Sequence, residues 1–272
     1  MAVKFNRYKN GTTRALTFSY DDGHKHDRKL VEIFNRYGMH ATFHLNSRNI
    51  VNHGQWLLEP QEIGELFVGH EVSCHMPTHP HVTRIPHTAL AAEILDDRRN
   101  LEQLCGYVVR GMSYPYGTYS KAAEEILRTC GIEYSRTTVA TEWFAPPDNF
   151  LEWNPTCHHA HPKLHELFER FAGPAPYAPL QVMNVWGHSL EFDMNNNWSI
   201  IEDFCKLASG REDIWYATNI EICDYLNALR ALRVSADCRI IYNPTAIDIW
   251  VTAEDKPCKI AAGETVTFEK GM

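Results

Sequence analysis

The sequence predicts an α/β protein built on a parallel sheet, closed into a barrel or open, with a small β addition at its C-terminal end. Strand and helix signals alternate along most of the chain, which is typical of parallel sheets. Residues 233–272 differ, because they carry β-branched runs at 239–242, 247–251 and 265–267. We therefore predict two parts, a main domain over residues 1–232 and a small β-rich extension over 233–272.

Hydrophobic periodicity and end signals assign the elements in order. Leu30, Val31 and Phe34 fall on one face of a helix that begins at Asp27 and ends before Gly38. The strands are short apolar runs bounded by turn residues. The expected strands are 15–20, 41–45, 71–74, 112–114 and 181–186. The expected helices are 27–37, 60–67, 88–104, 120–130, 199–207 and 219–232.

Composition excludes several classes of protein. The chain has 272 residues and a formal net charge of −8, and no basic stripe indicates a nucleic-acid partner. No apolar run has the length of a signal peptide or a membrane span, so we expect a cytoplasmic protein with no membrane partner. The eight cysteines include no CxxC pair, which favours reduced thiols over disulfides. Nothing in the sequence predicts an oligomeric state.

Polar residues follow several of the apolar runs, where parallel folds place their chemistry. Asp21 and Asp22 end the first strand, and two adjacent carboxylates repel each other unless a cation or hydrogen bonds offset the charge. His75 and His79 follow the third strand at a spacing that suits zinc or a similar ion. Each pattern alone also fits a solvated turn or a pair of surface histidines.

Two further clusters complete the set. The turn Tyr114–Gly117 could expose a backbone N–H as an oxyanion donor. His188 ends a buried strand, where a general acid or base would stand. Alone, the first also fits an ordinary turn and the second a core histidine.

The order of these clusters resembles the polysaccharide deacetylases, also called the NodB-homology family or carbohydrate esterase family 4, over residues 14 to 230. That resemblance implies a distorted (β/α)7-type barrel and removal of acetyl groups from an N- or O-acetylated sugar. The substrate would be a small molecule or an oligosaccharide. It also implies a divalent metal, for which zinc is favoured over cobalt, nickel or iron.

The resemblance assigns roles to individual residues. Asp21 would be the general base and His188 the general acid, while Asp22, His75 and His79 would bind the metal. The backbone N–H of Tyr116 would stabilise the oxyanion. Trp153, Tyr114 and Trp186 are the candidates for lining the substrate site.

This sequence departs from the family pattern at the base. Ser113 stands where the family carries an arginine that pairs with the catalytic aspartate, and Arg110 lies three residues earlier. Loss of a cationic partner would raise the pKa of Asp21. A carboxylate that orients His188 is also expected, and Asp148, Glu152 and Glu191 are equal candidates.

Some alternatives stay open. His158, His159 and His161 could form a second metal site that the family does not require, or line the cleft. The chain could also be a carbohydrate-binding relative that has lost turnover, which the missing arginine supports. A third alternative is hydrolysis of a non-sugar C–N bond, as in allantoinase-like relatives.

Overall fold

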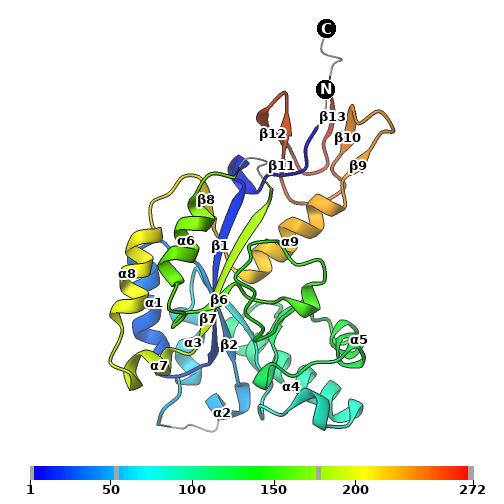
Figure 1. The fold of residues 1–272 in the computed structure, drawn as a ribbon. Coiled ribbons are helices and arrows are strands. Elements are labelled where there is room, and N and C mark those ends of the chain that lie inside the picture. The colour runs from blue at the N-terminus through cyan, green and yellow to red at the C-terminus, as the bar shows by residue number, and fades with distance from the viewer. Residues whose placement is uncertain (1–2, 52–54, 176–178, 269–272) are drawn as a thin grey trace.

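The computed structural model describes residues 3–51, 55–175 and 179–268, and its main part is a curled parallel sheet wrapped by helices (Figure 1). Seven strands follow one another in the order β5-β4-β3-β2-β1-β7-β6, and β8 pairs with β1 outside this path. These strands are β1 (Arg14–Asp22), β2 (Ala41–Leu45), β3 (Glu71–Cys74), β4 (Gly111–Ser113), β5 (Tyr134–Arg136), β6 (Cys157–His158), β7 (Gln181–Gly187) and β8 (Ile214–Tyr216). The predicted (β/α)7-type fold is confirmed.

The central strand β1 positions the rest of the sheet. It pairs in parallel with β7 over residues 14–20, with β2 over 18–22 and with β8 over 14–16. Residues 14–21 are all buried, as expected for a parallel strand covered on both faces. Because all these strands run in one direction, the side chains that follow β1, β3, β4 and β7 meet at one edge.

Helices cover the sheet in two packed groups. Figure 1 shows α1, α6 and α8 on one flank and α4 and α5 on the other, while α9 lies beside the C-terminal strands. The helices are α1 (Asp27–Arg36), α2 (Ser47–Val51), α3 (Ile63–Leu66), α4 (His87–Cys105), α5 (Lys121–Thr129), α6 (Leu164–Ala172), α7 (Ser189–Met194), α8 (Ser199–Ala208) and α9 (Asn219–Arg230). Short 3-10 turns are η1 (Lys9–Gly11), η2 (Pro60–Glu62), η3 (Val82–Arg84), η4 (Pro115–Gly117) and η5 (Phe150–Glu152).

The expected elements agree with the structure to within one or two residues at most ends, although 60–67 divides into η2 and α3. The strands β5, β6 and β8 were not predicted, because they have only two or three residues and too few positions to show a period. The helices α2, α6 and α7 were missed as well. The eight cysteines are free, as expected. In the described part of the chain no helix is long and apolar enough to cross a bilayer.

The C-terminal strands form two small sheets. The strands β9 (Arg233–Val234), β10 (Ile240–Tyr242) and β13 (Thr265–Thr267) make one, and β11 (Ile249–Ala253) pairs with β12 (Lys256–Ile260) in the other. The predicted β addition is confirmed, while the domain boundary at residue 232 stays a prediction.

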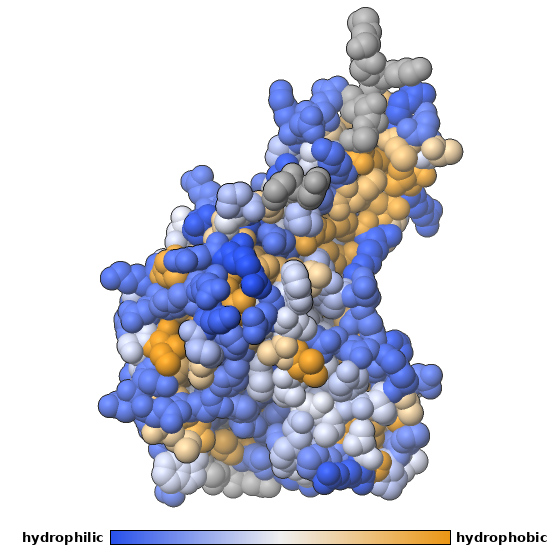
Figure 2. Space-filling view, in the orientation of Figure 1, coloured by the Kyte–Doolittle hydropathy of each residue, from blue (hydrophilic) through white to orange (hydrophobic). Residues whose placement is uncertain are grey.

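The extension shares a hydrophobic core with the barrel. Ile241 and Val251 belong to the same buried cluster as Ala15 of β1 and Val182 of β7. Polar residues dominate the barrel face seen in Figure 2, whereas apolar residues gather over the C-terminal strands. The extension therefore packs onto the start of the barrel strands, away from the edge that carries the polar clusters.

A buried carboxyl group in the sheet should make stability depend on pH. Burial raises the pKa of Glu71 to about 7 from its ordinary value of 4.5, although hydrogen bonds from Tyr134, Ile220 and Thr42 oppose the shift. Between pH 4.5 and about pH 7, Glu71 is mostly protonated in the folded protein but mostly ionised in the unfolded chain. The free energy of unfolding should therefore fall by up to about 3 kcal/mol as the pH rises through this window.

The variant Glu71→Gln tests this expectation. Its amide oxygen could accept the bonds from Ile220 and Thr42, and its NH2 could donate to the Tyr134 hydroxyl, which also donates to Ser73 Oγ. Urea unfolding at pH 5 and pH 8 should show a smaller decline in stability than in the wild type. An unchanged decline would mean that other groups cause it.

Candidate metal centre

The structure brings Asp22, His75 and His79 together at the carboxyl edge of the sheet. Asp22 Oδ1 lies 3.6 Å from His75 Nε2 and 3.9 Å from His79 Nε2, and the two Nε2 atoms are 3.1 Å apart. One ligand atom from each side chain lies within 4.8 Å of the others. Asp22 ends β1 with a φ of 81°, a left-handed conformation that few L-residues adopt. The three residues predicted to bind metal therefore form one group.

The histidine pair comes from the loop that follows β3. Met76 and His79 have φ values of 62° and 51°. The Asn46 side chain donates to the carbonyls of His75 and Met76, each at 2.8 Å. Asp97 of α4, fully buried, accepts from the backbone N–H of His75 at 3.0 Å. Two polar side chains from neighbouring elements thus hold the loop in its unusual conformation.

The surroundings of His75 favour metal binding at its Nε2 atom. Its Nδ1 lies 3.0 Å from the carbonyl oxygen of Ser113, which can only accept a hydrogen bond. Nδ1 must therefore carry the proton, which leaves the lone pair of Nε2 directed at His79 and Asp22. Two imidazole nitrogens and a carboxylate with open positions are a donor set that suits zinc and related divalent ions. These residues fit a divalent metal.

Asp21 is buried beside this group and has a cationic partner. Its Oδ1 accepts from Ser113 Oγ at 2.9 Å, and its Oδ2 accepts from the Arg136 guanidinium. Burial alone would raise the pKa of Asp21, but the charge of Arg136, together with those of His75, His44 and His188, outweighs burial and holds the pKa well below the ordinary value. The prediction that Ser113 leaves the base without a cation was wrong.

The arginine comes from another strand. Arg136 ends β5, is 0% exposed, and donates from Nε to Ser19 Oγ at 2.9 Å. Its guanidinium also lies over the Trp186 ring, 4.6 Å from the centroid. Arg110 instead forms a two-bond pair with Asp224, on the outside of the sheet. Arg136 was missed because it ends a three-residue strand and matches no motif.

The Ser113 side chain connects Asp21 to His75. Its hydroxyl donates to Asp21 Oδ1 and lies 2.7 Å from His75 Nδ1. Through this one side chain, the ionised Asp21 favours the tautomer of His75 that exposes Nε2.

His188 faces the aspartate pair from the end of β7. Its Nε2 is 4.0 Å from Asp21 Oδ2 and 3.9 Å from Asp22 Oδ2, while its Nδ1 lies 2.7 Å from Glu191 Oε1. Burial lowers the pKa of His188, but the Glu191 carboxylate and both aspartates raise it to about 9. Of the three candidate partners, Glu191 is the one that contacts His188.

The neighbouring histidine cluster converges on the same carboxylate. His158 Nε2 and His159 Nε2 lie 3.1 Å and 3.2 Å from Glu191 Oε2. His161 points elsewhere, with its Nε2 3.4 Å from Glu142. Ligand atoms of His158, His188 and Glu191 are close enough to hold an ion, but hydrogen bonds to Glu191 already account for this arrangement. We therefore interpret the cluster as support for His188.

The aromatic candidates divide into two pairs. Tyr116 is 59% exposed, has a φ of 56°, and its ring contacts His79 at 4.4 Å between centroids. Trp186 lies within 6.0 Å of the His188 ring. Both therefore stand at the site. The oxyanion role of the Tyr116 N–H stays a prediction.

Trp153 and Tyr114 have positions that contradict a substrate-lining role. Trp153 is 2% exposed and packs against Tyr134 and Phe150. Tyr114 is 1% exposed and donates to the Leu151 carbonyl. Both rings are buried, so they belong to the core.

Removing the charge of Glu191 should weaken His188 as a proton donor. In Glu191→Gln the pKa of His188 should fall, and the alkaline limb of the pH–rate profile should move to lower pH. We expect the turnover rate to decrease by about a hundredfold. Glu152→Gln is the matched control, because Glu152 pairs with Tyr119 and Lys121. An equal effect of both variants would argue against a specific role for Glu191.

Comparisons with known proteins agree with this geometry. Residues 8–135 match the family model of the polysaccharide deacetylases. No curated protein matches the sequence. Among solved structures, a candidate polysaccharide deacetylase from Mycobacterium smegmatis has a TM-score of 0.63 at 15% identity, covering 82% of this chain and 93% of that one. Some chains are matched only in part, one of them over 61% of its length.

Two other structures are similar at 15% identity. The Xyl-CE4 domain of a multidomain xylanase, from the hindgut metagenome of Trinervitermes trinervoides, has a TM-score of 0.54 over 79% of this chain and 91% of that one. A CE4 family pseudoenzyme from Bacillus anthracis has a TM-score of 0.51 over 80% and 67%. These likenesses concern the fold. The matched residues 8–135 hold the aspartate and histidine pairs, and over this part of the sequence the chain is similar to the polysaccharide deacetylases.

Proposed function

We propose that this protein is a metal-dependent hydrolase that removes acetyl groups from an N- or O-acetylated sugar. The observation that carries the proposal is the convergence of Asp22, His75 and His79 beside a buried Asp21 and the Glu191-bound His188. The similarity of residues 8–135 to the polysaccharide deacetylases supports a carbohydrate substrate. For the metal we favour zinc, because two nitrogen donors and one carboxylate suit it.

A divalent metal held by Asp22, His75 and His79 would supply Lewis acidity for the acetyl carbonyl and for water. Asp21 takes a proton from the attacking water, since its low pKa keeps it ionised and each of its oxygens keeps a further acceptor site. The Tyr116 N–H donates to the developing oxyanion. His188, held by Glu191, protonates the leaving group. The acetyl C–N or C–O bond breaks, and acetate and a free amine or hydroxyl form.

Arg136 supports an active enzyme over a carbohydrate-binding relative without turnover. The argument for lost activity was the missing motif arginine, and Arg136 supplies the same charge to Asp21 from β5. The two metal-ligand histidines, both aspartates and His188 are all present and close together.

Acetate release tests the proposal directly. Zinc-loaded protein should release acetate from N-acetylglucosamine, its oligomers or acetylated xylan. Chelation should abolish the release, and added zinc should restore it. Absence of acetate with every sugar, together with opening of a cyclic amide such as allantoin, would replace the proposal with hydrolysis of a non-sugar C–N bond.

A further inference from the structure

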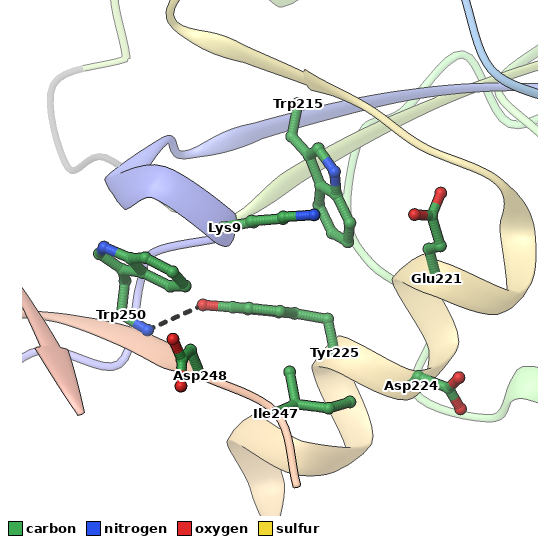
Figure 3. Close-up of a pocket in the computed structure, with 8 residues that line it drawn as sticks. All are labelled: Lys9, Trp215, Glu221, Asp224, Tyr225, Ile247, Asp248 and Trp250. Carbon is green, nitrogen blue, oxygen red and sulfur yellow. Dashed lines mark hydrogen bonds between the residues drawn. The ribbon is translucent and has the colours of Figure 1, made fainter. Parts of the chain in front are cut away.

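A pocket of about 370 Å³ lies between the barrel and the C-terminal strands, far from the metal centre. Its lining comes from η1, β8, α9 and the segment that enters β11 (Figure 3). The lining residues are Lys9, Trp215, Glu221, Asp224, Tyr225, Ile247, Asp248 and Trp250. Trp215 pairs with Ala15, seven residues before Asp22 on β1, which corresponds to about 23 Å along the strand. The pocket is therefore separate from the proposed catalytic site.

Three aromatic rings form rigid walls of this pocket. Tyr225 is 2% exposed, and its ring lies 5.5 Å from that of Trp215 at 62°. The Tyr225 hydroxyl accepts from the backbone N–H of Trp250 at 2.9 Å and donates to the Arg7 carbonyl at 3.1 Å. Trp215 and Trp250 are half-buried, so part of each indole remains accessible. Rings held in this way lose little entropy when a flat apolar face packs on them.

The charged groups of the pocket are balanced. Arg110 neutralises Asp224 through two hydrogen bonds, and Lys259 pairs with Asp248 at 3.1 Å. This leaves Lys9 opposite Glu221. A pocket with balanced charge favours a neutral ligand, because a net charge on the ligand would meet repulsion from one side.

Two polar atoms in the pocket are available to a ligand. Glu221 Oε2 caps α9 by accepting from Thr218, and Glu221 Oε1 has no hydrogen bond within the described segments. Lys9 Nζ likewise forms no hydrogen bond or ion pair with any residue that the structure describes. In Figure 3, the Lys9 side chain extends between the two tryptophans toward Trp215. One donor and one acceptor thus flank the aromatic faces.

We propose that this pocket is a second carbohydrate-binding site, which takes a neutral saccharide. A pyranose ring has apolar C–H faces that would pack on Trp215 or Trp250 and hydroxyl groups that would bond to Lys9 and Glu221. Aromatic rings alone could also bind a cationic ligand, but the Lys9 ammonium would repel it. The site would hold a second segment of a long or polymeric saccharide, and it goes beyond the proposed hydrolysis because binding needs no turnover.

Calorimetric titration with tetra-N-acetylchitotetraose and with xylotetraose tests the proposal. The full chain should carry Asp21→Asn, so that the probe stays intact. In this background Trp250→Ala should weaken binding of at least one probe by about tenfold, and Lys9→Met should weaken it severalfold. The fully deacetylated, cationic chitotetraose should bind more weakly than its neutral counterpart.

Trp143→Ala is the matched control, because Trp143 is 74% exposed and lies outside this pocket. It should leave the affinity unchanged. The proposal fails if neither probe binds, if both pocket variants bind with wild-type affinity, or if the cationic tetramer binds more tightly than the neutral one. Lys9 is exposed, so Lys9→Met keeps the test decisive even if Trp250→Ala does not fold. Binding that Trp250→Ala or Lys9→Met weakens, together with no acetate release by the zinc-loaded wild type, would support this site and count against the proposed hydrolysis.

Discussion

Asp22→Ala and His79→Ala should each purify with far less bound metal than the wild type and should lose at least about a thousandfold in acetate release. Each substitution removes one of three ligand side chains whose donor atoms lie within 4.8 Å of one another. Losing the metal removes several kcal/mol of transition-state stabilisation, and each 1.4 kcal/mol is a factor of about ten in rate. Metal content by mass spectrometry and acetate release by an enzymatic assay measure the two effects separately.

Two controls separate metal binding from other roles. Asp21→Asn should keep the metal and lose turnover, because Asp21 contacts Arg136 and Ser113 and lies outside the ligand group. His81→Ala should keep the metal. His81 follows His75 and His79 in the same loop and stacks on the Tyr116 ring, but it is not one of the three proposed ligands. Full metal occupancy in Asp22→Ala or His79→Ala would contradict the assigned ligands.

Arg136→Met should destabilise the protein and inactivate it. Arg136 is 0% exposed, and removing its charge leaves the buried Asp21 carboxylate without a cation. Breaking a buried pair from one side costs about 3–5 kcal/mol. The pKa of Asp21 should rise in the variant, so that a larger fraction of the base is protonated at neutral pH. Urea unfolding and acetate release at pH 7 measure these two losses.

The pH dependence of the loss identifies Asp21 as the group involved. In the wild type, the depressed pKa of Asp21 contributes stability above the unfolded pKa of about 4, and this contribution is lost at lower pH. In the variant, the raised pKa of Asp21 destabilises the folded state at neutral pH, and this penalty disappears as the carboxyl becomes protonated. The difference in stability between the two proteins should therefore shrink as the pH falls from 7 toward 4, and shrink further below pH 4 as the wild type loses its own contribution. A difference that is independent of pH would mean that lost packing of the arginine dominates.

A surface arginine and a double variant complete the comparison. Arg110→Met removes a partly exposed pair with Asp224 and should cost no more than about 1 kcal/mol. Arg136→Met combined with Asp21→Asn should recover part of the stability and none of the activity. Wild-type stability and turnover in Arg136→Met alone would show that the pair is unimportant.

The fold was accessible from the sequence because local patterns encode it, whereas the candidate metal ligands came from the family that the order of the motifs resembles. Alternation of apolar runs with helix signals gave most strands of the sheet, and strand ends in parallel folds share one edge. Asp22 ends β1, and His75 and His79 lie in the loop after β3, so all three stand at this edge of the sheet. Short elements such as β5 and β6 contain too few residues to leave a pattern.

Contacts between distant segments were decided by the tertiary structure alone. Ser113, at the motif position, carries no charge, and Arg136 supplies a positive charge to Asp21 instead. Arg136 lies 115 residues after Asp21 in the sequence and contacts it because β5 belongs to the same curled sheet as β1. Glu191 was one of three equal candidates until the turn after β7 placed it against His188. Trp153, equally able to line a cleft or fill a core, lies in the core, where it packs against Tyr134 and Phe150. Residue types and spacing determine which groups are available, while burial and pairing depend on the packing of strands that are remote in sequence.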